Sequence, residues 1–154
     1  MMIMVKPAFF DESVFDIITE PSAYWMGFFL ADGTIAKTNQ LRVKLAGRDS
    51  GHLQKLKAFL LSEAKIIETM EPRNGKFHSS VSLTFCSKKI RFLFAQLGIY
   101  RSGGAREIPD FLKNDRHFWR GVIDGDGHIG ISDTGIARLI LVGNKSVLDA
   151  FLEY

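Results

Sequence analysis

Two stretches decide the fold of this chain: WMGFFLADG at residues 25–33 and WRGVIDGDG at residues 119–127. Each is an apolar run that ends in Asp-Gly, which is typical of a helix that stops at a glycine. Asp32 and Asp126 hold the same position in the two copies, so the repeat has a period of 94 residues. A repeat of this length indicates duplicated units that pack together.

The segments after each stretch repeat as well. After the first we expect a hairpin over 34–47, a helix opened by Asp49 and Ser50 that carries Leu61 on its apolar side, and a hairpin that turns at 72–76. A helix capped by Ser87 and closed by Gly98 should then lead into a polar linker. After the second stretch we expect only a hairpin and a helix from a polar cap. The predicted domains are therefore residues 1–112 and a partial copy at 113–154, so the chain is either a fragment or degenerate in its second half.

Small residues recur at helical spacing in both stretches. Gly27 and Ala31 are four residues apart in the first copy, and Gly121 and Gly125 are four apart in the second. Four residues make about one helical turn, so each helix presents a stripe of small side chains. Such stripes allow two helix backbones to approach closely. We expect the two helices, the first of them capped by Ser22, to pack on each other.

The acid at the end of each stretch is in an unfavourable place, because a helix C-terminus already carries partial negative charge. If the helices run parallel, Asp32 and Asp126 lie close together and repel unless a cation or a proton sits between them. Mg²⁺ or Mn²⁺ would relieve the repulsion, since Mg²⁺ takes one or two carboxylates plus waters and phosphate oxygens. Gly33 and Gly127 suit a left-handed turn at each helix end. That ending would leave the carbonyls of Ala31 and Gly125 free to join the metal shell.

Simpler interpretations of these acids stay open. A single Ala-Asp-Gly after a helix is an ordinary helix end and turn. The sequence DGDGHIGISD also resembles a calcium-binding loop, but a loop that starts at Asp124 would put Ile129 where the required glycine belongs and Gly135 where the bidentate Glu belongs. The repetition of the acid favours a metal site built from two helices.

Polar residues that alternate with apolar ones along the expected strands form a candidate DNA-binding face. Arginine and lysine bind phosphate or guanine, and asparagine and glutamine suit adenine. An ordinary solvated sheet face is the alternative for each residue alone. The candidates are Lys37, Asn39, Gln40, Arg42, Lys44, Arg73, Lys76, His78, Ser80, Ser82 and Thr84, with His128 and Arg138 from the second copy.

Composition sets few limits on function. The net charge of +3 leans towards an anionic partner, and 46% hydrophobic with 24% charged residues is ordinary for a globular chain. Cys86 is the only cysteine, which excludes an internal disulfide and a Cys-rich zinc site and favours a reducing compartment. The N-terminal residues resemble neither a signal peptide nor a membrane span, so we expect a cytoplasmic or organellar location and no membrane partner.

With these motifs in view, the chain resembles the LAGLIDADG homing endonucleases. The two copies WMGFFLADG and WRGVIDGDG carry the resemblance, together with RDSGHLQKLKAFL, the LGI and IP of the linker, and ILVGNKSVLDAFL. The resemblance implies an α+β fold of αββαββα units in pseudo-symmetric pairs, with the motif helices at their interface and the sheets over the DNA major groove. It also implies a double-strand break by phosphodiester hydrolysis, with no small-molecule cofactor.

The resemblance also assigns roles to residues. The last acid of each motif, here Asp32 and Asp126, would bind the catalytic divalent ions, whereas Asp124 matches an earlier acid that is not catalytic. A lysine of the linker in many active members corresponds here to Arg101, which stays protonated and would stabilise charge without shuttling protons.

Three functions follow as hypotheses. The first is a metal-dependent DNA endonuclease encoded by a mobile intron, intein or free-standing gene. The second is a non-cleaving DNA-binding regulator or RNA-splicing maturase of the same fold. The third is a protein-interaction module that uses the helix stripes to dimerise. The small-residue stripes of two motif helices would pack on each other, either within one longer chain as a pseudo-dimer or between two copies of the chain as a homodimer.

Overall fold

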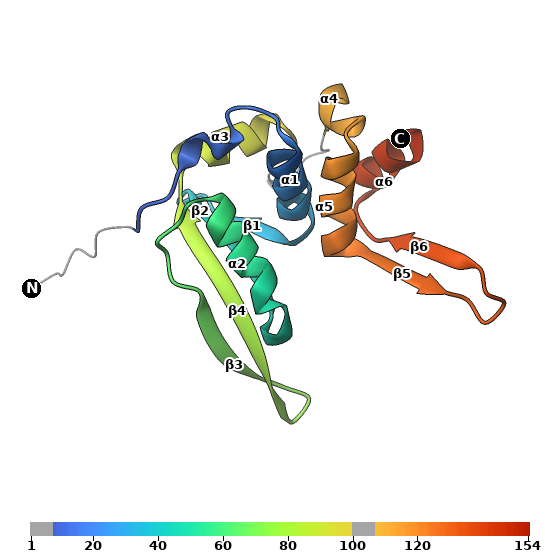
Figure 1. Ribbon diagram of the computed structural model, residues 1–154, viewed down its shortest axis with the longest axis horizontal. Helices are drawn as coiled ribbons and strands as arrows, with labels where there is room; N and C mark the ends of the chain where they lie inside the picture. Colours follow the sequence, from blue (N-terminus) through green and yellow to red (C-terminus); the bar gives the residue numbers. More distant parts are fainter. Residues whose placement is uncertain (1–7, 100–106) are drawn as a thin grey trace, which may run out of the picture. The chain divides into compact units, whose positions relative to one another are not determined.

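The computed structural model describes residues 8–99 and 107–154 and has an α+β fold with two separate sheets (Figure 1). The chain forms two compact units. The first unit holds the described residues up to Asp16 together with Thr34–Arg91, and the second holds Ile17–Gly33 together with the described part of Phe92–Tyr154. Both repeated stretches lie in the second unit. These units therefore follow packing and do not coincide with the predicted domains 1–112 and 113–154.

The first unit is built on a four-stranded sheet. Its strands are β1 (Gly33–Ile35), β2 (Gln40–Ala46), β3 (Ile67–Arg73) and β4 (Lys76–Cys86), in the order β1-β2-β4-β3. Asn74 and Gly75 join β3 to β4 with φ values of 52° and 73°. Two positive φ values in a two-residue loop match the twist of antiparallel strands, which confirms the predicted turn at this place.

One face of this sheet is apolar and makes the core of the first unit. Leu41 and Val43 on β2 pair with Phe85 and Leu83 on β4, and all four side chains are buried. Helix α2 (Ser50–Phe59) lies along the sheet in Figure 1 and buries its Leu53 and Leu56 side chains. The short helix η1 (Glu12–Phe15) adds Phe15, whose ring meets Phe59 edge-on. The predicted alternation of apolar and polar residues is confirmed.

Two expectations about α2 are wrong in detail. Leu61 is not on the buried side of the helix, because the helix ends at Phe59 and Leu61 is exposed with a φ of 47°. Asp49 occupies the N-cap position, but its side chain makes no capping hydrogen bond. Its φ of −96° and ψ of 15° continue the preceding short helix η2 (Gly47–Asp49) instead of the extended backbone usual at an N-cap.

The second unit is mainly helical. Helices α1 (Glu20–Asp32) and α5 (Arg116–Asp126) lie side by side in Figure 1, and α6 (Lys145–Glu153) packs on α5 through the rings of Phe151 and Trp119. The cap of α1 is Thr19 and not Ser22. Ser22 closes a reciprocal capping box, in which its hydroxyl accepts from the Thr19 N–H at 2.7 Å. No helix in the described ranges is long and apolar enough to cross a membrane.

Two further helices flank the linker. Helix α3 (Lys88–Gln96) starts where the Ser87 hydroxyl accepts from the Ile90 N–H at 2.9 Å, and Gly98 follows it with a φ of 68°, as predicted. The last residues of the expected linker form a short helix, α4 (Asp110–Lys113). The polar cap of α6 is also confirmed, since the Asn144 side chain accepts from the Val147 N–H at 3.0 Å.

In its described residues the second unit carries a two-stranded sheet, made of β5 (Gly127–Ile131) and β6 (Ala137–Leu141). Its register pairs Ile129 with Leu139 and Ile131 with Ala137, so one face of the hairpin is apolar. Ile131 is nevertheless 78% exposed and Leu139 is 44% exposed. The apolar face of this hairpin is therefore exposed.

Candidate metal centre and nucleic-acid interface

The site starts from the close approach of α1 and α5, which the glycines permit. A Cβ on Gly27 would lie 1.9 Å from the Phe118 carbonyl oxygen, and a Cβ on Gly121 would lie 2.0 Å from the Tyr24 carbonyl oxygen. No larger residue fits at either position without moving a backbone. The small-residue stripes therefore form the helix contact, as the sequence predicts.

The two helices run parallel. Residues near the start of α1 meet residues near the start of α5, and the order is kept to the end, where Gly125 lies against Ala31 and Asp32. A Cβ on Gly125 would be 2.4 Å from the Ala31 Cβ and 3.4 Å from the Asp32 carboxylate Oδ2. Asp126 is the next residue after Gly125. The structure thus brings the C-terminal ends of the two helices together, and each end carries one of the repeated acids.

Each helix passes straight into a strand, so the expectation of a left-handed turn at Gly33 and Gly127 is wrong. Their φ values are −77° and −94°, with extended backbone. Glycine is required here for space: a Cβ on Gly33 would lie 2.5 Å from the Phe29 ring, and a Cβ on Gly127 would lie 2.5 Å from the Ile123 carbonyl oxygen. The glycine N–H groups donate to those same two residues' carbonyls and close the last turns.

The pair of acids suits a divalent cation. Asp32 and Asp126 are half-buried, and both lie at helix ends that carry partial negative charge. Two carboxylates match what Mg²⁺ takes from a protein when waters and phosphate oxygens complete its octahedron. Within residues 8–99 and 107–154 no group of three or more His, Cys, Asp or Glu side chains gathers at one place. A two-carboxylate site is the metal chemistry that these helices offer.

A polar link between the helices was missed by the sequence argument. The Tyr24 hydroxyl donates to the Asp124 carboxylate at 2.8 Å, and the Arg120 guanidinium lies 4.8 Å from the centre of the Tyr24 ring. Burial, followed by the hydrogen bond to Asp124, raises the pKa of Tyr24 well above its ordinary value. The spacing of Arg120 and Asp124, one helical turn apart, is the only signal that the sequence offers for this cluster.

The second face of the first unit's sheet collects the predicted DNA-binding residues. The register sets Arg42 opposite Thr84 and Lys44 opposite Ser82 on β2 and β4, and Arg73 opposite Lys76 on β3 and β4. Because side chains alternate along a strand, these positions share one side of the sheet with the remaining strand candidates. The full set is Gln40, Arg42, Lys44, Arg73, Lys76, His78, Ser80, Ser82 and Thr84.

The members of this set differ in how available they are. Arg42, Arg73, Lys76 and His78 are exposed. Lys44 forms an ion pair with Glu71 across the same face. Ser82, expected to be exposed, is only 9% exposed, because it lies in a central strand between Lys44 of β2 and Ile67 of β3. The face therefore presents mainly arginine, lysine and histidine.

The DNA-binding candidates in turns also differ in how available their side chains are. Lys37 is exposed in the loop between β1 and β2, whereas the Asn39 side chain accepts a hydrogen bond from Arg91 at 3.1 Å. His128 and Arg138 both lie exposed on the polar side of the β5–β6 hairpin. Arg101, predicted to act near the metal, lies outside the described residues.

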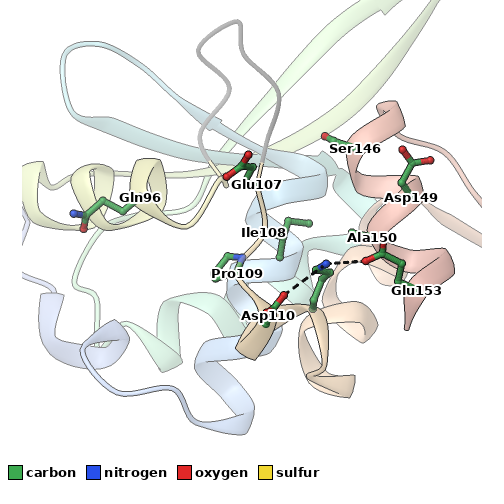
Figure 2. A pocket seen from close by; sticks show the side chains of 10 residues that line it. Gln96, Glu107, Ile108, Pro109, Asp110, Ser146, Asp149, Ala150 and Glu153 are labelled. Carbon is green, nitrogen blue, oxygen red and sulfur yellow. Dashed lines mark hydrogen bonds and ion pairs between the residues drawn. The ribbon is translucent and has the colours of Figure 1, made fainter.

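A cavity of about 650 Å³ in the second unit is separate from the paired acids (Figure 2). It lies between α6 and the segment around α4, where the Lys113 ammonium contacts Glu153 at 2.7 Å and Asp110 at 3.6 Å. Its lining includes neither Asp32 nor Asp126. Carboxylates of Glu107 and Asp149 also line it, so the cavity is a poor receptor for an anionic substrate.

Comparison of the chain with protein-family models and with curated proteins finds no match.

Proposed function

We propose that this chain is a LAGLIDADG-type DNA endonuclease, which hydrolyses phosphodiester bonds with a divalent metal ion to make a double-strand break. The observation that carries the proposal is the parallel packing of the two repeated helices, which brings Asp32 and Asp126 to one end of the pair. The element order α1-β1-β2-α2-β3-β4-α3, followed by α5-β5-β6-α6 with α4 before it, supports an αββαββα unit and the start of a second.

In this proposal Asp32 and Asp126 hold Mg²⁺ or Mn²⁺, with the carbonyls of Ala31 and Gly125 as further ligands. The bound ion supplies Lewis acidity and a water of lowered pKa. The parallel helices would let the two carboxylates share it, and the half-buried setting would strengthen their attraction for a cation. Arg101 would stabilise charge on the phosphate as a permanent cation.

Double-stranded DNA is the substrate that the basic sheet face favours. Four cationic residues, Arg42, Lys44, Arg73 and Lys76, share this face with one acid, Glu71. Arginine and lysine side chains on an exposed sheet bind phosphates and the acceptor atoms of guanine. If they do so here, Arg42→Gln lowers the slope of log affinity against log salt by about one. Lys55→Gln on α2 is the matched control and leaves the slope unchanged.

The proposal is tested with a library of supercoiled plasmids that carry random inserts, incubated with the protein and Mg²⁺. Linear plasmid from selected inserts is the expected product, and sequencing of the ends identifies the target. Asp32→Asn and Asp126→Asn should each abolish cleavage of that target while DNA binding persists. Cleavage that survives both substitutions would refute the assigned site.

The alternative is a non-cleaving DNA-binding regulator or RNA-splicing maturase of the same fold. One observation favours it: the second sheet has two strands where the first has four, so the second half offers a smaller binding face. Dependence on the metal ion distinguishes the two functions. In a regulator or a maturase, Asp32→Asn leaves nucleic-acid affinity and biological activity unchanged, and no insert in the library is cut.

A further inference from the structure

The contact between α1 and α5 has a polar flank formed by Tyr24, Arg120 and Asp124. The Tyr24 hydroxyl donates to Asp124 Oδ2 at 2.8 Å, and the Tyr24 ring lies under the Arg120 guanidinium. Tyr24 is buried, whereas Asp124 is exposed, so the bond lies at the edge of the helix contact. A hydrogen bond to an ionised acceptor is stronger than one between neutral groups.

The internal repeat places apolar residues where this polar flank has polar ones. With the 94-residue period, Tyr24 corresponds to Phe118, Asp124 to Leu30 and Arg120 to Met26. Those three counterparts are apolar and buried, at 2% exposure or less. The hydrogen bond between Tyr24 and Asp124 therefore has no polar counterpart at the matching positions of the repeat.

The glycine contacts bring the helices together, since Gly27 and Gly121 present bare backbone to the partner helix. The Tyr24 hydrogen bond adds a directional contact between the same two helices. A hydrogen bond is directional and weakens steeply when its angle or length changes. Asp124 directly precedes Gly125, which lies against Ala31 and Asp32. A shift of α5 along α1 would thus stretch the Tyr24 bond and move the paired acids apart.

We propose that Tyr24 and Asp124 are positioning residues: their hydrogen bond sets the register of α5 on α1 and so holds Asp32 and Asp126 at the spacing that one divalent cation bridges. This inference rests on the proposed function. Neither residue binds the metal in this scheme, since each acts through the acids at the helix ends. The raised pKa of Tyr24 keeps its hydroxyl protonated, and able to donate, across the neutral range.

The first test measures Mn²⁺ affinity by the loss of the free-ion signal in electron paramagnetic resonance. Tyr24→Phe removes the donor and should raise the dissociation constant about 5- to 10-fold, an effect of the size expected for the loss of one ordinary hydrogen bond. Asp124→Asn keeps an acceptor oxygen for the Tyr24 hydroxyl and should stay within about twofold of the parent. Equal weakening by both substitutions would contradict the positioning role.

A double variant separates positioning from stability. Tyr24→Phe with Asp124→Leu reproduces the apolar pair Phe118 and Leu30 on this flank and leaves no unsatisfied polar group. We expect its thermal midpoint to return to that of the parent while Mn²⁺ affinity stays about 5- to 10-fold weaker. If affinity recovers together with stability, the hydrogen bond is merely structural and the inference is overturned.

A metal-free measurement distinguishes this inference from the proposed function. The N–H groups of Gly33 and Gly127 close the last turns of α1 and α5, so their hydrogen exchange reports on the helix ends. Tyr24→Phe should accelerate both by about tenfold and leave the Leu83 amide unchanged. Unchanged exchange overturns the positioning role. A parent chain that binds no Mn²⁺ through Asp32 overturns the metal centre instead, and the exchange result then decides the inference alone.

Discussion

Glycines at the helix contact decide whether the two acids can meet. A Cβ on Gly121 would approach the Tyr24 carbonyl oxygen to 2.0 Å, so Gly121→Ala must push the helices apart. We expect it to lower the unfolding free energy by about 1–3 kcal/mol, as overpacking does. Gly51→Ala in α2 is the matched control, because a Cβ there meets nothing within 4 Å.

The control substitution should change the unfolding free energy in the opposite direction. Alanine in a helix is favoured over glycine, so Gly51→Ala should raise the unfolding free energy by about 0.5–1 kcal/mol. Urea denaturation of the two variants measures both effects. Equal changes would mean that the backbone of α1 and α5 is not in close contact.

Tyr24 gives the molecule an alkaline dependence of stability. Its pKa in the folded state is raised above the ordinary value of 10.0, first by burial and then by Asp124. The folded state therefore keeps the proton longer than the unfolded state does. The resulting stability is complete below about pH 10 and is lost as pH rises through the folded pKa.

Urea unfolding at pH values from about 9 to 11 should then show a falling free energy that is less steep in Tyr24→Phe. Tyrosinate absorbance gives an independent reading, since one tyrosine should titrate above the ordinary range in the parent and be missing from the variant. A titration of the parent in which all tyrosines ionise together near pH 10 would contradict the buried bond.

At this scale the sequence predicts that the helix ends carrying Asp32 and Asp126 meet, because the repeat marks these ends and the small residues allow close packing. For Asp124 the resemblance implies only a non-catalytic acid, and the sequence does not predict its partner. The reason is that Tyr24 and Asp124 are 100 residues apart and are joined only when the helices take their parallel register. The extended backbone at Gly33 was likewise hidden, since glycine serves both left-handed turns and tight contacts.

Strands that follow the two motif helices share a pattern but not an environment. Aligned on Gly47 and Gly143, Val43 of β2 corresponds to Leu139 of β6. Val43 is fully buried between β4 and α2, whereas Leu139 is 44% exposed on the two-stranded sheet. The strand sequence alone predicts an apolar face in both, and the neighbouring elements decide which face is covered.

Matched substitutions test this difference. Val43→Thr buries a hydroxyl in the core and should lower the unfolding free energy by about 1–3 kcal/mol. Leu139→Thr, on the open face, should change it by no more than about 0.5 kcal/mol and reduce the binding of a hydrophobic dye. Chemical denaturation and dye fluorescence provide the two readings. A large loss of stability in Leu139→Thr would contradict the open hairpin.

For the whole molecule, we propose that Asp32 and Asp126 act together on one metal ion. The first four strands and the helices were predictable because alternation, caps and the Asn-Gly turn are local signals. The division into two compact units was not predictable, because α1 belongs to the same unit as α5 although the strands that follow α1 in the chain belong to the first unit. The packing of α1 on α5 would give the paired acids a shared site.

The most direct test of that claim is a calorimetric titration of the chain with Mn²⁺, alongside Asp32→Asn, Asp126→Asn and the double variant. We expect one ion per chain, a dissociation constant raised at least about tenfold by either substitution, and little further loss in the double variant, since coupled residues are not additive. Asp149→Asn, which alters an ion pair on α6, should bind as the parent does. Single variants that keep the parent's affinity, or losses that simply add, would contradict a shared metal site.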